Sequence, residues 1–277
     1  MEHVLVEHDV PTVLGRIRVR TDGDGPAMLM WPSLLMDGNL WSAQAAHFAD
    51  RFTVLVVDPP GHGSSEPLTR GFTFDECATV IEQVLDHFGM PRAHILGNSW
   101  GGMIGGTFAA LHPDRAGVSV LMNATASTAG RRQRFEYAAM LRAARLLGGI
   151  KPPLTHSVLK AFLGPTSLRT RRDVVRTVRG SLSRADMASA TWAVRSVVPD
   201  RPDQRELFGR IRTPVLVIAG EEDATFPVAE TRIMADAIPG SSFVVIDAAA
   251  HLAAIEVPDQ VNALVDDFLA QHPSHAM

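Results

Sequence analysis

Short apolar runs alternate with longer amphipathic stretches along most of this chain. Residues 15–20 alternate apolar and polar side chains with a period of two, as a half-buried β-strand does. Residues 27–31 and 53–57 are continuous apolar runs, which are typical of strands buried on both faces of a sheet. The same reasoning predicts further strands at residues 93–96, 118–122, 214–218 and 243–246.

Helical spacing separates these strands. It is clearest over residues 74–88, where Val80, Ile81, Val84 and Leu85 fall on one face of a helix. Other helices are predicted at residues 40–48, 100–111, 228–237 and 258–269. This alternation of strands and helices predicts an α/β fold with a mostly parallel central sheet and helices on both faces.

The middle of the chain breaks this alternation. Residues 126–205 contain no convincing strand, are rich in Ala, Leu and Arg, and are interrupted by Gly-Gly, Pro-Pro and Gly-Pro pairs, which favours several short helices. We therefore expect a core made of residues 1–126 and 206–277, with residues 127–205 forming a helical lid, or cap, over it.

The charge of the chain is divided unevenly between these parts. The net charge is −4, but residues 126–205 hold about sixteen Lys or Arg against about five Asp or Glu. The favoured interpretation is a solvated, arginine-rich helical surface, and electrostatic attraction of an anionic substrate is the alternative. Nucleic-acid binding is disfavoured, because the segment lacks interleaved aromatic residues and matches no known module.

The amino-acid composition narrows the type of protein further. The 277 residues are 46% hydrophobic and 20% charged, which is ordinary for a globular chain. Cys77 is the one cysteine, so no intrachain disulfide can form. The N-terminus lacks the basic start of a signal peptide, and no segment approaches the length of a membrane span. These features predict a cytoplasmic protein that does not bind membranes.

A candidate nucleophile follows the predicted strand at residues 93–96. Residues 97–102 read GNSWGG and open the next predicted helix. The G-x-S-x-G pattern is weak alone, but a strand, a tight turn and a helix around it indicate a nucleophile elbow. Small residues two positions either side of Ser99 would let strand and helix approach, and the helix N-terminus would favour developing negative charge.

A serine needs a base, and the base needs an orienting acid. His251 follows the last predicted strand, and Asp223 follows the strand at residues 214–218, so both fall at the same sheet edge as Ser99. His62 and His94 are the competing histidines; His62 is better interpreted as bracing its loop and His94 as structural. The glutamates beside Asp223 are the alternative acids. We predict a triad of Ser99, Asp223 and His251.

With these motifs in place, the chain resembles the α/β-hydrolase superfamily over nearly its full length. Residues 58–65 are similar to the D-x-x-G-H-G-x-S turn of that superfamily, and Glu256 and Pro258 to the E-x-P that follows its histidine. Residues 33–41 and 123–126 are similar to segments of 3-oxoadipate enol-lactonase-like hydrolases. The resemblance implies an α/β-hydrolase fold, with the helical lid inserted after the sixth strand of that fold.

The resemblance also implies an oxyanion hole, with two departures from the common pattern. Pro32-Ser33 replaces the usual His-Gly of the superfamily, and alignment on Trp41 makes the backbone N–H of Leu34 one donor. The N–H of Trp100 is the other. Asn98, directly before the nucleophile, is similar to the residue found in hydrolases that cleave carbon–carbon bonds, so the bond cleaved stays open.

The predicted function is therefore hydrolysis of a carboxylic ester or lactone through an acyl-enzyme on Ser99. The alternatives are a C–C bond hydrolase of vinylogous diketones, and a ligand-binding receptor on a hydrolase scaffold. We expect no cofactor and no metal, because no His/Cys/Asp cluster has ligand spacing. The expected partner is a small-molecule substrate, with a homodimer as one option for assembly.

Substrate contacts are expected from the lid and the elbow. Trp192 stands among small neighbours, which suits a pocket wall, and Tyr137 is another aromatic candidate. Asn98 is the third predicted substrate contact. For each lid aromatic taken alone, packing of the lid onto the core is the competing interpretation. The identity of the substrate is left open by the sequence.

Overall fold

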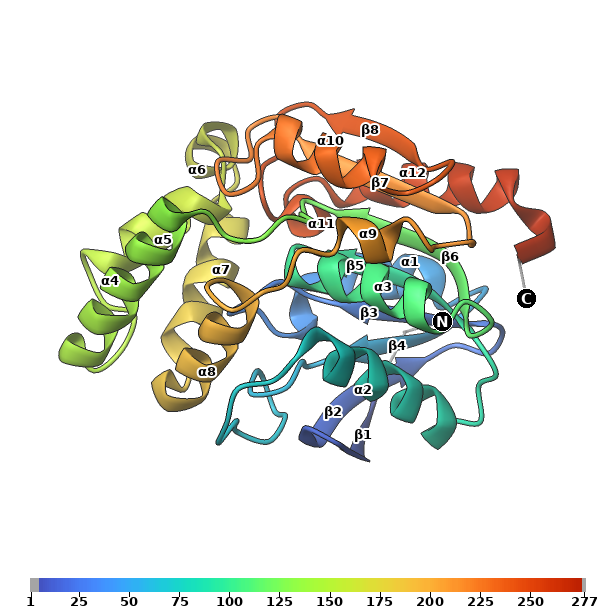
Figure 1. The fold of residues 1–277 in the computed structure, drawn as a ribbon, viewed down its shortest axis with the longest axis horizontal. Helices are drawn as coiled ribbons and strands as arrows, with labels where there is room; N and C mark the ends of the chain where they lie inside the picture. Colours follow the sequence, from blue (N-terminus) through green and yellow to red (C-terminus); the bar gives the residue numbers. More distant parts are fainter. Residues whose placement is uncertain (1–4, 276–277) are drawn as a thin grey trace.

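The computed structural model describes residues 5–275 and contains one eight-stranded sheet with the order β1-β2-β4-β3-β5-β6-β7-β8. The pairings of β1 with β2 and of β2 with β4 are antiparallel, and all others are parallel. Figure 1 shows the sheet running through the centre of the molecule. The strands are β1 (Val6–Thr12), β2 (Gly15–Asp22), β3 (Ala27–Trp31), β4 (Thr53–Val57), β5 (Ala93–Asn98), β6 (Ala116–Met122), β7 (Val215–Gly220) and β8 (Ser242–Ile246).

The seven strands predicted from period-two alternation and apolar runs are all present, and the sequence pattern missed β1. This edge strand contains Pro11 and buries only Val10 fully, so its apolar signal is weak. Proline is tolerated at a sheet edge because one side of the strand donates no ladder hydrogen bonds. Its register on β2, from Val6 opposite Thr21 to Thr12 opposite Gly15, is fixed by tertiary pairing.

Alternate residues of the central strands enter two separate cores. In β3, Leu29 and Trp31 belong to one apolar cluster, and Met28 and Met30 belong to the other. Strands buried on both faces need apolar residues at every position, which explains the continuous runs in the sequence. The first cluster is covered by α2 (Phe74–His87), α3 (Trp100–Leu111), α9 (Arg205–Phe208) and α10 (Val228–Asp236); the second by η1 (Gly38–Trp41), α1 (Ser42–Phe48), α11 (Ala253–Glu256) and α12 (Pro258–Gln271).

A helical insertion, α4–α8, separates β6 from α9. Figure 1 shows these helices gathered at one end of the sheet, away from both termini. That the insertion acts as a lid stays a prediction. Its helices are α4 (Arg131–Leu147), α5 (Leu154–Phe162), α6 (Pro165–Thr170), α7 (Arg172–Arg184) and α8 (Met187–Val197), and a short η2 (Pro273–His275) follows α12. Among the described residues, no helix is long and apolar enough to cross a membrane.

His94 of β5 is a buried structural histidine. Its side chain is fully buried, and its Nδ1 accepts a hydrogen bond from the backbone N–H of Val118 at 3.0 Å. The Nε2 atom has no hydrogen-bond partner among the described residues. Burial, together with the nearby charge of Arg92, lowers the pKa of His94 to about 4, so the imidazole is neutral in the folded protein.

Acid is therefore expected to destabilise the fold through His94. Its pKa is about 6.5 when unfolded and about 4 when folded, so between these values the unfolded state binds more protons. This contribution to the free energy of unfolding is fully present above about pH 6.5 and is lost as the pH falls. The loss reaches about 3 kcal/mol near pH 4. Urea unfolding at about pH 7 and about pH 4.5 measures this loss.

The matched variant is His94→Asn, whose side-chain oxygen replaces Nδ1 as the acceptor of the Val118 N–H but does not titrate. We expect its free energy of unfolding to fall less with acid than that of the wild type. Equal slopes in the two proteins would show that His94 does not carry the effect.

Candidate active site

Ser99 lies on the turn between β5 and α3, in a backbone conformation that L-residues rarely adopt. Its φ is 58° and its ψ is −113°. The flanking positions have no room for a side chain: a Cβ at Gly97 would lie 2.1 Å from the carbonyl oxygen of Gly101, and one at Gly101 would lie 1.9 Å from that of Trp31. The strained turn is therefore held by close backbone packing, as the predicted elbow requires.

The structure brings the three predicted triad residues together. The Nε2 of His251 lies 2.7 Å from the Oγ of Ser99, and its Nδ1 lies 2.9 Å from Oδ2 of Asp223. The exposed fractions are 5% for Ser99, 1% for His251 and 4% for Asp223. The Oδ1 of Asp223 accepts backbone N–H bonds from the next turn, at 2.8 Å from Thr225 and 3.0 Å from Phe226. The carboxylate is thus fixed with one oxygen left for the imidazole.

One other acid and one other base near the triad have different hydrogen-bond partners. Glu222, the alternative acid, accepts hydrogen bonds from the N–H and hydroxyl of Thr166 in the insertion. His62, the alternative base, accepts the N–H of Leu35 at its Nε2 (3.0 Å), and its Nδ1 lies 2.9 Å from the carbonyl of Pro60. Burial lowers the pKa of His62, which keeps its Nε2 available as an acceptor. The histidine in contact with Ser99 is therefore His251, and the carboxylate in contact with His251 is Asp223.

Asn98, predicted as a substrate contact, is not among the residues that line the cavity beside Ser99. It is fully buried, and its Nδ2 donates to the backbone carbonyl of His251 (2.7 Å) and to Oγ of Ser33 (2.8 Å). Asn123 donates to the same His251 carbonyl at 3.2 Å. The side chain of Asn98 is therefore occupied by the histidine loop and by Ser33. Its contacts hold the histidine loop against the elbow.

The two predicted oxyanion donors flank Ser99. Leu34 lines the same cavity as Ser99, and Trp100 is the first residue of α3. Within residues 5–275, neither backbone N–H donates to another protein group, which leaves both free for a ligand oxygen. Ser33, in the place of the usual glycine, is fully buried, and its hydroxyl bonds to Asn98. This substitution therefore ties the loop to the elbow.

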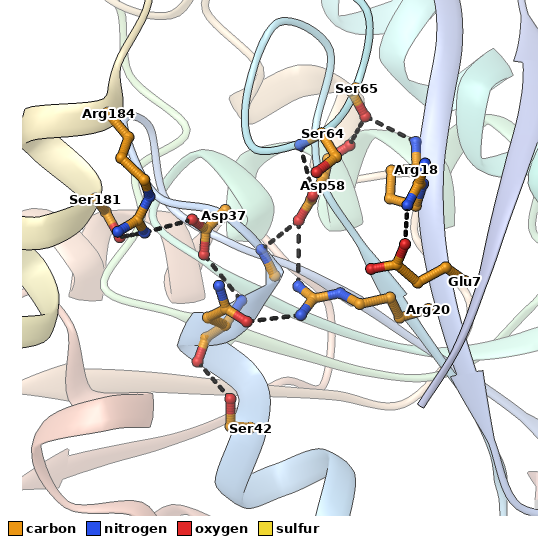
Figure 2. A network of polar contacts seen from close by, with 12 residues as sticks. Glu7, Arg18, Arg20, Asp37, Ser42, Asp58, Ser64, Ser65, Ser181 and Arg184 are labelled. Carbon is orange, nitrogen blue, oxygen red and sulfur yellow. Dashed lines mark hydrogen bonds and ion pairs between the residues drawn. The ribbon is translucent and has the colours of Figure 1, made fainter. Parts of the chain in front are cut away.

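A polar network braces the turns on either side of this loop (Figure 2). One oxygen of Asp58 accepts the N–H of Gly38, and the other accepts the N–H of Ser64, both at 2.8 Å. Asp37 joins the same network to the insertion, since its Oδ2 accepts a hydrogen bond from Arg184 at 3.1 Å. Arg184 is largely exposed, so this ion pair contributes little stability. Asp58, by contrast, is itself buried, and two backbone N–H groups fix its carboxylate.

A narrow cavity of about 80 Å³ lies beside Ser99 and His251, between the core and the insertion. Tyr137 of α4 lines it, as predicted, and Phe162 of α5 stacks on the His251 ring with centroids 5.6 Å apart. Most of the lining side chains are apolar. The polar ones are Ser99, Gln133, Tyr137, Arg201, Thr225 and His251.

Trp192, predicted as a pocket wall, is not among the residues that line this cavity. The cavity face of α8 is the stripe Met187, Ala190, Val194 and Val197. Trp192 falls on the opposite face, because a helix turns about 100° per residue. That face docks on residues 61–72, and Arg195 lies 5.6 Å from the Trp192 ring. Small neighbours in the sequence did not indicate a pocket.

The architecture and the elbow are matched by a known family. A family model described as the alpha/beta hydrolase fold matches residues 26–258, well over half of the chain. The chain belongs to the α/β-hydrolase family. The α/β-hydrolase fold class expected from the sequence is thereby confirmed, and the chain order of Ser99, Asp223 and His251 is the order usual for α/β-hydrolases.

Several α/β-hydrolases are similar over most of the chain. A 3-oxoadipate enol-lactonase 2 from Acinetobacter baylyi is 27% identical over 88% of each chain. A 2-hydroxy-6-oxononadienedioate/2-hydroxy-6-oxononatrienedioate hydrolase 2 from Pseudomonas putida is 30% identical over 92% of this chain and 87% of its own. The crystal structure of the enol-lactonase from Burkholderia xenovorans superposes with a TM-score of 0.86 at 26% identity, covering 95% of this chain and 100% of that one. The resemblance to enol-lactonase-like hydrolases is confirmed.

Glu256 is a site residue whose role the sequence did not reveal. Its Oε1 accepts the backbone N–H groups of Ala250 (3.0 Å) and Leu252 (3.1 Å), the two neighbours of His251. Its Oε2 accepts the hydroxyl of Ser167 from the insertion, at 2.5 Å. Burial raises the pKa of Glu256 despite these bonds. Its place in the E-x-P motif was the available signal, but only the fold shows that it clamps the histidine loop.

Proposed function

We propose that this α/β-hydrolase is a serine hydrolase that cleaves a carboxylic ester or lactone through an acyl-enzyme on Ser99. The observation that carries the proposal is the buried hydrogen-bond chain from Ser99 through His251 to Asp223, which opens on a cavity. A serine hydroxyl becomes a nucleophile when a hydrogen-bonded base takes its proton, and the base works when a third group orients it.

Acylation follows from this geometry. Nε2 of His251 takes the hydroxyl proton while Oγ of Ser99 forms a bond to the substrate carbonyl carbon. The carbonyl electron pair moves onto oxygen, where the N–H groups of Leu34 and Trp100 stabilise the oxyanion. When the intermediate collapses, the bond to the leaving alkoxide breaks, and the alkoxide takes the proton from His251. Asp223 stabilises the imidazolium throughout.

Deacylation repeats the sequence with water. His251 takes a proton from water, the hydroxide oxygen bonds to the acyl carbon, and the collapse of the second intermediate returns the proton to Ser99. Phe162 stacks on His251 from the insertion, and Phe226 lies 5.5 Å from it on another side. These rings would exclude bulk water from the imidazole, and the contribution of Phe162 supports the proposed role of residues 127–205 as a lid.

C–C bond hydrolysis is the second candidate, and it rests on the relatives. The Pseudomonas putida relative at 30% identity is named as a 2-hydroxy-6-oxononadienedioate hydrolase. The position of Asn98 gives it no support, because that side chain is occupied with the His251 loop. Ester or lactone hydrolysis is therefore favoured.

The test uses p-nitrophenyl acetate, butyrate and octanoate. We expect prompt release of p-nitrophenol from the two short esters and slower release from octanoate, because a cavity of about 80 Å³ is smaller than the roughly 300 Å³ of pockets for larger ligands. Mass spectrometry after rapid acid quenching should find one acetyl group on the peptide that contains Ser99.

Each other outcome points to a specific alternative. Inert wild-type protein that still binds small esters would support a receptor. Turnover of a vinylogous 1,5-diketone without ester hydrolysis would support the C–C hydrolase. Faster octanoate turnover would show that the insertion opens far more widely than the structure does.

A further inference from the structure

The cavity beside Ser99 contains one charged side chain outside the triad, Arg201, just after α8. It is 5% exposed, whereas the other arginines and lysines of residues 127–205 are exposed or, for Arg171, partly exposed. Most basic residues of the insertion therefore lie on a solvated surface, which is the interpretation favoured from the sequence. Arg201 is the exception, because it is buried at the cavity.

The guanidinium of Arg201 has only neutral hydrogen-bond partners within residues 5–275. Its Nε donates to the carbonyl of Ser127 at 2.7 Å, one Nη donates to Oε1 of Gln133 at 3.1 Å, and its Cζ lies 5.5 Å from the Phe226 ring. Its Nη1 has no hydrogen-bond partner in this part of the chain. The charge of the nearby Glu230 carboxylate acts on Arg201, but among the described residues the two form no ion pair, and Oε1 of Glu230 accepts the hydroxyl of Thr125. Arg201 is thus a buried cation without a carboxylate partner.

Such a charge is costly for a fold to retain. A buried cation is normally paired, because the interior does not replace the hydration that it loses. Burial lowers the pKa of Arg201 to about 10, so the guanidinium is still charged at neutral pH. An anionic ligand from outside the chain would supply the ion pair that the Arg201 guanidinium lacks.

The path from Arg201 to the nucleophile is short. The guanidinium lies against Phe226, Phe226 lies 5.5 Å from the His251 ring, and His251 bonds to Ser99. Tyr137 lines the same cavity, and the charges of Arg201 and Asp223 both act on its phenol. Burial raises the pKa of Tyr137, so the phenol is a neutral hydrogen-bond donor. One small molecule can therefore reach both the guanidinium and the nucleophile.

We infer that Arg201, with Tyr137 and Gln133, forms a carboxylate subsite, and that the substrate is an ester or lactone carrying a carboxylate away from its scissile carbonyl. The inference rests on the proposed function of Ser99. Arginine suits this task because its planar fork binds both oxygens of a carboxylate. A carboxylate held there would pair the buried charge and align the other end of the substrate with Ser99.

The test compares two p-nitrophenyl esters of glutaric acid, one with its second carboxyl free and one with it methylated. The wild type should favour the free acid in kcat/KM by roughly tenfold to hundredfold, the effect of a charged hydrogen bond. In Arg201→Gln the preference should disappear, mainly through a higher KM for the acid. Arg179→Gln, which changes an exposed arginine of α7, is the matched control and should keep the preference.

A binding measurement separates this inference from the proposed function. Glutarate should bind to Ser99→Ala in calorimetry and bind at least tenfold more weakly to the double variant with Arg201→Gln. Binding without turnover of either ester would overturn the serine hydrolase and support the subsite. Ser99-dependent turnover of both esters without preference for the acid, in the wild type, would overturn the subsite and leave the hydrolase standing. The wild-type comparison decides the matter even if Arg201→Gln does not fold.

Discussion

Replacing Ser99 with alanine is expected to lower kcat for p-nitrophenyl acetate by about 10⁵- to 10⁶-fold, with little change in the thermal midpoint. The Ser99 hydroxyl is the group that would form the acyl-enzyme. Among the described residues, it is the one hydroxyl that Nε2 of His251 contacts, at 2.7 Å. The residual rate would come from substrate binding and the two oxyanion donors, Leu34 and Trp100. Steady-state kinetics with active-site titration of the wild type measure the loss.

The matched control for this variant is Ser183→Ala, which removes the hydroxyl of an exposed serine in α7. Its kcat should equal that of the wild type. The acetyl group found on the wild-type peptide should be absent from Ser99→Ala. If this variant kept more than about 1% of wild-type kcat, Ser99 would not be the nucleophile.

Replacing Asp223 with asparagine is expected to lower kcat by about 10⁴-fold without unfolding the protein. The two backbone donors, Thr225 and Phe226, fix which way the new amide lies, because they need an oxygen acceptor at the Oδ1 position. The amide nitrogen then faces Nδ1 of His251 and donates to it. This places the imidazole proton on Nε2, where it points at Ser99 and prevents the ring from acting as a base.

Glu221→Gln serves as the control for this second variant, since Glu221 is an exposed carboxylate in the same turn. Its kcat should stay at the wild-type value. The variant Glu222→Gln addresses the alternative acid and should change kcat by no more than a few-fold, because Glu222 bonds to Thr166 of the insertion. A large loss in Glu222→Gln together with an active Asp223→Asn would assign the orienting role to Glu222.

The oxyanion loop shows how far local sequence reasoning reaches. The motif around residues 58–65 indicated a turn, and His62 was interpreted as bracing its own loop. In the structure His62 also accepts the N–H of Leu35, directly after the proposed oxyanion donor. The turn was recognisable because its glycines and Asp58 leave a local signature. Its contact with Leu35 depends on the parallel packing of β3 beside β4, which no local signature contains.

Local sequence also did not show which aromatic and amide side chains face the cavity. Trp192 and Asn98 were expected at the substrate, yet one faces the core segment 61–72 and the other holds the His251 loop. Tyr137 was expected there and lines the cavity. The expectations for Trp192 and Tyr137 rested on residue type and neighbours, and the expectation for Asn98 rested on a resemblance to C–C bond hydrolases. Which face of a helix or strand meets the cavity is set by packing between segments far apart in the chain.

The residues of the sequence determined the strands, the elbow and the order of Ser99, Asp223 and His251, because periodic burial and tight turns impose local residue patterns. The tertiary structure decided the edge strand β1, the clamp of Glu256 on the histidine loop and the unpaired Arg201 in the cavity. Arg201 was one of about sixteen basic residues in a charged segment. Only folding buries it without a carboxylate partner, because burial and pairing depend on contacts between distant parts of the chain.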